Sequence, residues 1–177
     1  MSTWSTGGGR DQLADALGAL MRAEHFDRIE RLGLIYDAEG DAAAMGQKIQ
    51  GALRQCGLPV PSNPLKTASS PGKPLTAYLV VPHGAKTGCI EHLLIGAYHH
   101  GQVGVQRAEK YVADAASGRA ASSQWSQENW AAKAKIHSLI AVSQQPEATL
   151  GESALAGLWD PDHEVLKPIR DLIELLS

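Results

Sequence analysis

The sequence predicts an α/β fold, because short apolar runs alternate with segments of helical period. Residues 32–36 are nearly all apolar, as expected for a strand whose two faces are both covered. Residues 76–82 (TAYLVVP) have the β-branched, aromatic and aliphatic content of another buried strand. Each run is followed by a turn and then by apolar residues at helical spacing. Repeated strand–turn–helix units indicate a sheet covered by helices.

A glycine run near the start of the chain is a candidate phosphate-binding turn. Gly7, Gly8 and Gly9 stand between a predicted strand at residues 2–6 and a predicted amphipathic helix at residues 13–21. Backbone N–H groups in such a turn are able to face an anion at the start of the helix. Neither a Walker lysine–serine pair nor the spaced dinucleotide fingerprint accompanies them. A flexible turn explains the glycines equally well.

An acidic turn follows the strand at residues 32–36 and is the candidate metal site. Strand alternation puts Asp37 and Glu39 on the same side, about 6–7 Å apart along the chain. Open α/β sheets bind ligands beyond the carboxyl ends of their strands. Two carboxylates there suit Mg²⁺, which prefers oxygen ligands and keeps waters that a phosphate displaces. The alternative is an ordinary turn, with Asp41 as the N-cap of the next helix.

A third carboxylate, Glu91, lies in the first turn of a helix predicted from residue 89 to about residue 100. That helix starts where the strand at 76–82 ends, so we expect Glu91 near the same edge of the sheet. A favourable charge at the positive end of the helix is the other interpretation. Lys133 and Lys135 lie on a later helix and are expected on a solvated face.

The remaining elements follow from spacing and punctuation. The segment at residues 58–75 holds five prolines and is predicted to be an exposed loop without regular structure. Residues 117–127 are small and polar, which also predicts a loop. Pro168 is expected to kink or restart the last helix. Further helices are predicted at residues 41–56, 104–116, 129–142, 149–158 (with a capping box) and from 160 onward.

Composition restricts the kind of protein. The chain has 177 residues, a net charge of −3 and 44% hydrophobic residues, which predicts one domain over residues 1–177 with a helical extension from about residue 125. No stretch reaches the roughly 18 apolar residues of a membrane span, and no signal peptide is evident, so we expect a cytoplasmic protein without a membrane partner. Two cysteines form neither a zinc pattern nor a disulfide framework. The absence of a basic stripe weakens nucleic acid as a partner.

Short motifs in order along nearly the whole chain carry a family resemblance. The segments are Gly7-Gly8-Gly9, Leu32 to Glu39, Gly57 to Pro61, Val81-Pro82, Gly88 to Glu91, Lys133-Ala134-Lys135, and Leu150-Gly151 ahead of Leu158-Trp159-Asp160. The chain resembles a bacterial toprim-like family of uncharacterised proteins, related to the toprim domains of topoisomerases, primases and OLD-type nucleases.

The resemblance implies a three-layer α/β fold with a small, mainly parallel sheet of about three to four strands, flanked by helices. It also implies Mg²⁺-dependent phosphodiester cleavage, joining or nucleotidyl transfer. In such domains a glutamate after the first strand is the general acid or base, and an Asp-x-Asp pair after a later strand binds the metal. Asp37 and Glu39 match the pair, and Glu91 adds an acidic position.

Two departures from the toprim pattern shape the expected function. The pair here is Asp-x-Glu, which alters oxygen ligation without abolishing it. No glutamate precedes Glu24, so the family's first strand and its catalytic glutamate have no counterpart, unless another chain supplies the group. Loss of that strand would leave a sheet edge unpaired, which favours a homodimer through this edge.

The leading hypothesis is therefore a non-catalytic or weakly active module that binds a nucleotide, a nucleic acid or a protein partner. By resemblance, such a module belongs to a mobile-element or defence system. The alternative is a nuclease or other phosphotransfer enzyme in which Asp37, Glu39 and Glu91 hold Mg²⁺ or Mn²⁺. A third hypothesis is an unrelated α/β domain whose acidic turn is only a turn.

Overall fold

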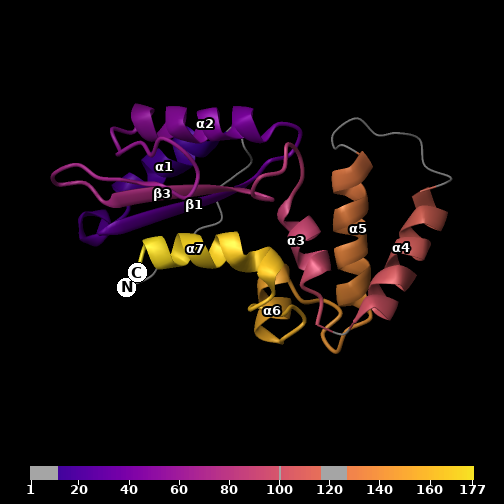
Figure 1. Ribbon diagram of the computed structural model, residues 1–177. Coiled ribbons are helices and arrows are strands. Elements are labelled where there is room, and N and C mark those ends of the chain that lie inside the picture. The colour runs from indigo at the N-terminus through magenta and orange to yellow at the C-terminus, as the bar shows by residue number, and fades with distance from the viewer. Residues whose placement is uncertain (1–11, 100, 117–126) are drawn as a thin grey trace. The chain divides into compact units, whose positions relative to one another are not determined.

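The computed structural model describes residues 12–99, 101–116 and 127–177 (Figure 1). It has the predicted α/β fold, a small three-stranded mixed sheet flanked by helices. The predicted strand at 2–6, the run Gly7, Gly8 and Gly9, and residues 117–126 of the predicted loop lie outside the described residues. In chain order the main elements are α1 (Leu13–Arg22), β1 (Arg31–Asp37), α2 (Ala42–Gln55), β2 (Thr67–Ala68), β3 (Leu75–Val81), α3 (Ile90–Gly96), α4 (Gln102–Ala116), α5 (Gln127–Ala141), α6 (Leu150–Leu155) and α7 (Lys167–Leu175).

Contacts divide the chain into two compact units. The first draws its described residues from 12–35, 43–80 and 171–177, and the second comprises 36–42 and the described part of 81–170. The predicted bounds of α1, α2, α4 and α5 differ from the observed bounds by at most two residues at either end. The prediction that residues 1–177 form one domain stays a prediction.

The first unit contains most of the sheet, whose strand order is β1-β3-β2. β2 pairs antiparallel with β3, with Thr67 opposite Ala77. The predicted loop at residues 58–75 is therefore wrong at β2. The side chain of Thr76, fully buried, donates a hydrogen bond to the carbonyl oxygen of Pro59 (2.6 Å), which ties the proline-rich segment to β3. Pairing of this kind depends on the partner strand and leaves no periodic signal in two residues.

Helices cover the sheet of the first unit, with α2 and the end of α7 on opposite faces (Figure 1). Gly46 of α2 lies against the Tyr78 ring, since a Cβ at this glycine would be 3.6 Å from the Tyr78 hydroxyl. A Cβ at Gly33 of β1 would be 2.6 Å from Cδ1 of Leu176. The glycine at position 33 therefore allows close approach of the C-terminal segment to β1, whereas a side chain at position 46 would make only an ordinary contact with Tyr78.

The second unit has its own apolar core, to which α3, α4 and α5 contribute. The indole of Trp159 packs against the Tyr98 ring, with centroids 6.0 Å apart. The buried members of this core are Leu94, Ala97, Ala108, Ile136, Leu139, Ile140, Leu158 and Trp159.

The helix predicted at residues 89–100 is shorter than expected, because α3 ends at Gly96. Beyond α3 the chain pairs with the segment after α6. The backbone N–H of His99 donates to the Leu158 oxygen (3.1 Å), and the N–H of Asp160 donates to the Ala97 oxygen (2.7 Å). These hydrogen bonds between distant segments replace the next turn of helix.

The C-terminal part of the chain confirms one predicted helix start and corrects another. Thr149 and Glu152 form the predicted capping box of α6. The helix predicted from residue 160 is wrong, because Asp160 instead accepts a hydrogen bond from the Asp162 N–H (3.0 Å) in a turn. A short 3₁₀ helix at Glu164–Leu166 precedes α7, whose first turn contains Pro168, in line with the expected restart.

Among the helices of the described ranges, none combines the length and the apolar character needed to cross a membrane.

Replacement of Leu139 by Ala should destabilise the protein by about 2–5 kcal/mol, because it leaves a cavity in the core of the second unit. Leu155→Ala is the matched control, since Leu155 is 91% exposed, and it should change the free energy of unfolding by less than about 0.5 kcal/mol. Urea unfolding followed by circular dichroism measures both. Equal effects would show that α5 does not pack as described.

Candidate acidic site

The acidic turn is held by backbone hydrogen bonds to the segment that follows β3. At the end of β1, the N–H of Ala38 donates to the oxygen of Val81 (2.8 Å). Next, Glu39 and Gly88 form an isolated antiparallel bridge. The Glu39 N–H donates to the Gly88 oxygen (2.7 Å) and the Gly88 N–H donates back to the Glu39 oxygen (2.9 Å). The turn is therefore fixed at Ala38 and Glu39, directly after Asp37.

The backbone at this bridge has an unusual conformation on both sides. Glu39 has φ 51°, in the left-handed region, and Gly88 has φ 131°. A Cβ at Gly88 would lie 2.7 Å from Cδ of the Pro82 ring, so only glycine fits there without movement. Because β1 ends at Asp37, strand alternation does not govern Glu39, and the bridge positions it instead. Left-handed non-glycine residues of this kind cluster at functional sites.

Asp37 is the last residue of β1, and its side chain reaches the start of α3. Its Oδ1 accepts a hydrogen bond from the Ile90 N–H (2.8 Å). Burial raises the pKa of Asp37 from its ordinary value to about 6. The hydrogen bond from Ile90 opposes this rise, as does the charge of Lys133, while the negative charges of Glu91 and Glu39 add to it. The predicted metal ligands Asp37, Glu39 and Glu91 are therefore close enough to interact electrostatically.

Glu91 is the buried member of this acidic cluster, which we define as Asp37, Glu39 and Glu91. Its side chain is only 9% exposed, and its Oε1 lies 3.9 Å from Nζ of Lys133. Its Oε2 is buried and has no hydrogen-bond partner among the residues that the structure describes. If Glu91 served only as a favourable charge at the start of α3, it would not need to be buried. A carboxylate on the surface interacts equally well with the positive end of a helix. A buried carboxylate oxygen without a donor is costly and calls for a functional explanation.

Two residues of α5 contact the cluster. The sequence pattern did not indicate Asn129 and predicted a solvated position for Lys133. Nδ2 of Asn129 donates to Oε2 of Glu39 (2.8 Å), and Asn129 is 1% exposed. Lys133 follows one helical turn later and contacts Glu91. Its side chain is 19% exposed, so the predicted solvated face is wrong for this lysine. A signal existed, because Asn129 shares a helix face with buried Ile136, and a polar residue on an apolar face indicates a specific partner.

Cys89 is adjacent to the cluster but is not a nucleophile. It is fully buried, and its N–H donates to Nδ1 of His92 (3.2 Å) in a cap at the start of α3. Burial, together with the Glu91 carboxylate, raises the pKa of the Cys89 thiol far above its usual range. The thiol therefore stays protonated, which is the unreactive form.

The chemistry of the cluster suits a hard cation, but the ligands are not assembled around one point. Within the described part of the chain, no three His, Cys, Asp or Glu side chains are grouped as metal ligands. One reason is that Asp37 and Glu39 each direct an oxygen to a protein donor, Ile90 or Asn129. A carboxylate has about four lone-pair sites, so each retains capacity to bind a cation. Carboxylate and amide oxygens are the ligands of Mg²⁺ and Ca²⁺.

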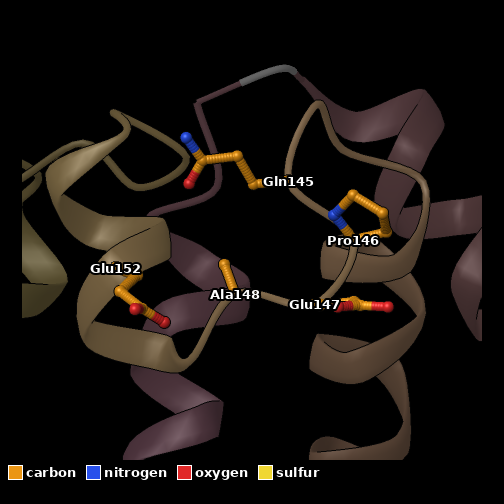
Figure 2. Close-up of a pocket in the computed structure, with 5 residues that line it drawn as sticks. All are labelled: Gln145, Pro146, Glu147, Ala148 and Glu152. Carbon is orange, nitrogen blue, oxygen red and sulfur yellow. The ribbon is translucent and has the colours of Figure 1, made fainter.

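The second unit also has an open pocket of about 380 Å³ at the start of α6, away from the cluster in sequence. Figure 2 shows Gln145, Pro146, Glu147, Ala148 and Glu152 around it. An oxygen of Glu152 accepts hydrogen bonds from the N–H and the hydroxyl of Thr149, which caps the helix. Among the described residues that line this pocket, the charged ones are Glu147 and Glu152, and Glu152 has a structural role as part of the helix cap. The acidic cluster is therefore the better candidate site.

The chain has an α/β fold and a partly buried acidic cluster at the start of helix α3. Residues 3–176 match the family described as "Protein of unknown function (DUF3226)". The chain belongs to this family. No curated protein and no solved structure matches it significantly. The toprim-like relationship stays a prediction.

Asp37→Asn should stabilise the protein at pH 7 by on the order of 1–3 kcal/mol, since an amide carries no charge to bury and still accepts from Ile90. The folded-state pKa of about 6 exceeds the unfolded value near 3.8, so the folded wild type binds more protons between them. Its stability should rise as the pH falls from about 6.5 to 4, and this rise should shrink in the variant. Urea unfolding at several pH values measures the free energy of unfolding of the wild type and the variant. Asp114→Asn, at an exposed position, is the control, and parallel pH profiles would contradict the assignment.

Gly88→Ala should destabilise the protein by about 2–4 kcal/mol, because the new Cβ meets the Pro82 ring and an unfavourable φ. Gly40→Ala lies in the same acidic turn, where a Cβ has nothing within 4 Å, and should have little effect. Thermal unfolding compares them. A similar loss in both variants would indicate that the bridge does not hold the turn.

Proposed function

We propose that this protein binds Mg²⁺ or Mn²⁺ through Asp37, Glu39 and Glu91, and that the bound ion holds a phosphate group of a nucleotide or nucleic acid. In this proposal the protein is a toprim-like binding module with no or weak catalytic activity. Membership of a mobile-element or defence system is part of the same proposal and rests on the resemblance alone.

The observation that carries the proposal is the unpartnered Oε2 of Glu91. A structural glutamate in an apolar setting is normally hydrogen-bonded or replaced by an apolar residue, because an unsatisfied buried acceptor is unfavourable. The negative charges of Glu91 and Glu39 both act on Asp37 and help to raise its pKa, so negative charge accumulates around Asp37. A divalent cation would offset both costs by ligating the oxygen and neutralising the charge.

The ligand class follows from the charge of the whole chain. The net charge is −3, so a phosphate is not attracted by the protein as a whole. Bound Mg²⁺ keeps several waters and usually contacts protein through one or two carboxylates together with substrate phosphates. We therefore favour a ligand whose phosphate group binds to the protein through the metal ion. A nucleotide fits this description better than an extended nucleic acid. The roles of Gly7, Gly8 and Gly9 in phosphate binding stay a prediction.

A second candidate, a metal-dependent nuclease or other phosphotransfer enzyme, is favoured by one observation. The pKa of Asp37, raised to about 6, lies near neutral pH, where a carboxyl group serves well as a general acid or base. Asp37 would then move a proton while Glu39 and Glu91 hold the metal. The catalytic glutamate of toprim domains has no counterpart in this chain, so this candidate needs Asp37 to replace it or another chain to supply it.

A homodimer through a sheet edge also remains a proposal. Among the described strands, β1 has one neighbour and stands at the edge of the sheet. An edge strand offers unpaired backbone groups to a second copy.

The test is calorimetric titration with Mg²⁺ and Mn²⁺. The wild type should bind at millimolar concentrations or tighter, and Asp37→Asn/Glu39→Gln should bind at least about 10-fold more weakly, because two anionic ligands are lost. Glu109→Gln/Asp114→Asn removes the same charge from the exposed face of α4 and should bind like the wild type.

The outcomes separate the candidates. Binding without metal-dependent hydrolysis of ATP, RNA or single-stranded DNA supports the binding module. Cleavage that the double variant lacks supports the enzyme. If neither metal binds to the wild type, the acidic turn is only a turn and both candidates are wrong.

A further inference from the structure

We infer that Lys133 is a built-in counter-ion of Glu91 that a divalent metal must displace. This inference rests on the proposed function and deepens it, because it says how the same site is kept folded without metal and what limits its affinity. Lys133 pairs with one oxygen of Glu91, while the other oxygen has no hydrogen-bond partner within the described ranges.

The contact between the two side chains is long for an ion pair that is largely shielded from water. Nζ of Lys133 lies 3.9 Å from Oε1 of Glu91, with side-chain exposures of 19% and 9%. Strong charge-assisted hydrogen bonds are about 2.7–2.9 Å long. Lys133 therefore supplies charge to Glu91 without a short hydrogen bond, which is a contact that a better cation is able to replace.

Among the described residues that act electrostatically on Asp37, negative charges outnumber positive ones. Three carboxylates, Asp37, Glu39 and Glu91, gather where one lysine contributes a single positive charge. A divalent ion carries two charges and is able to ligate the orphaned Oε2 of Glu91 at about 2.0–2.6 Å. The lysine ammonium is a compact charge on a flexible side chain. It is therefore suited to neutralise Glu91 until a metal ion binds.

Lysine and metal exclude each other at Glu91 for an electrostatic reason. An ion ligated to the carboxylate would lie within a few ångströms of Nζ, and the low local dielectric strengthens the repulsion between them. Lys133 has to swing away toward water when metal binds. Asn129, one turn earlier on α5, is an uncharged donor to Glu39 and has no such conflict. The face of α5 thus presents one fixed amide and one displaceable ammonium.

Lys133→Met tests the inference, because methionine keeps an unbranched side chain and removes the charge. By calorimetry it should bind Mg²⁺ at least about fivefold more tightly than the wild type, since no cation has to be displaced. Without metal its Tm should be lower by about 2–5 °C, since Glu91 loses its counter-ion. Lys135→Met is the matched control on the same helix, where Lys135 pairs with Glu109 (2.9 Å), and it should leave Mg²⁺ affinity unchanged.

A second measurement uses the wild type and does not depend on a variant that folds. Amine-reactive labelling followed by mass spectrometry should show Lys133 more reactive in saturating Mg²⁺ than in chelator, by about threefold or more, because the amine leaves a shielded position. Lys135 should label equally in both conditions.

Failure of this inference is distinguishable from failure of the proposed function. If the wild type binds Mg²⁺ and Asp37→Asn/Glu39→Gln does not, but Lys133→Met binds no more tightly and labelling of Lys133 is unchanged, the metal site stands and the counter-ion role is wrong. If Mg²⁺ binds to neither the wild type nor Lys133→Met, both are wrong.

Discussion

The paired hydrogen bonds between Glu39 and Gly88 are the constraint on which the candidate site depends. They stop β1 after Asp37 and hold Glu39 in a left-handed conformation against the segment that follows β3. The same segment leads directly into α3, so Asp37 meets the N–H of Ile90. Backbone hydrogen bonds to Glu39, together with the bond from the Ile90 N–H to the Asp37 side chain, thereby bring two acidic positions and the start of a helix together.

In the second unit, negative charge is concentrated at the acidic cluster of Asp37, Glu39 and Glu91. Burial raises the pKa of Asp37, and Glu91 has one buried oxygen that no group in the described part of the chain satisfies. Arrangements of this kind reduce the stability of a folded chain, and they recur where binding or catalysis compensates for the loss. Asn129 and Lys133 of α5 offset part of the cost, the first by a hydrogen bond and the second by charge. The core around Leu139 and Ile140 keeps α5 in place to do so.

Sequence patterns were most informative where the signal is local and periodic. The amphipathic spacing of α2, α4 and α5 and the capping box of α6 required no knowledge of the rest of the chain. Sequence patterns failed where contacts with a distant segment determine whether a strand or helix forms. β2 exists because β3 is beside it, and α3 ends early because its next residues pair with Trp159 and its neighbours. A two-residue strand and a truncated helix have no periodicity to detect.

The sequence by itself determined the α/β class, the match to a family of unknown function and the identity of three candidate acidic residues, but it did not establish the toprim-like relationship. Those features depend on residue types and short spacings, which can be read along the chain. Only the tertiary structure decided that Glu91 is buried, that one of its oxygens lacks a partner, and that Asn129 and Lys133 face the carboxylates. Burial and partnership depend on which segments meet in space, and residues 37, 91 and 133 are too far apart in sequence for any local pattern to link them.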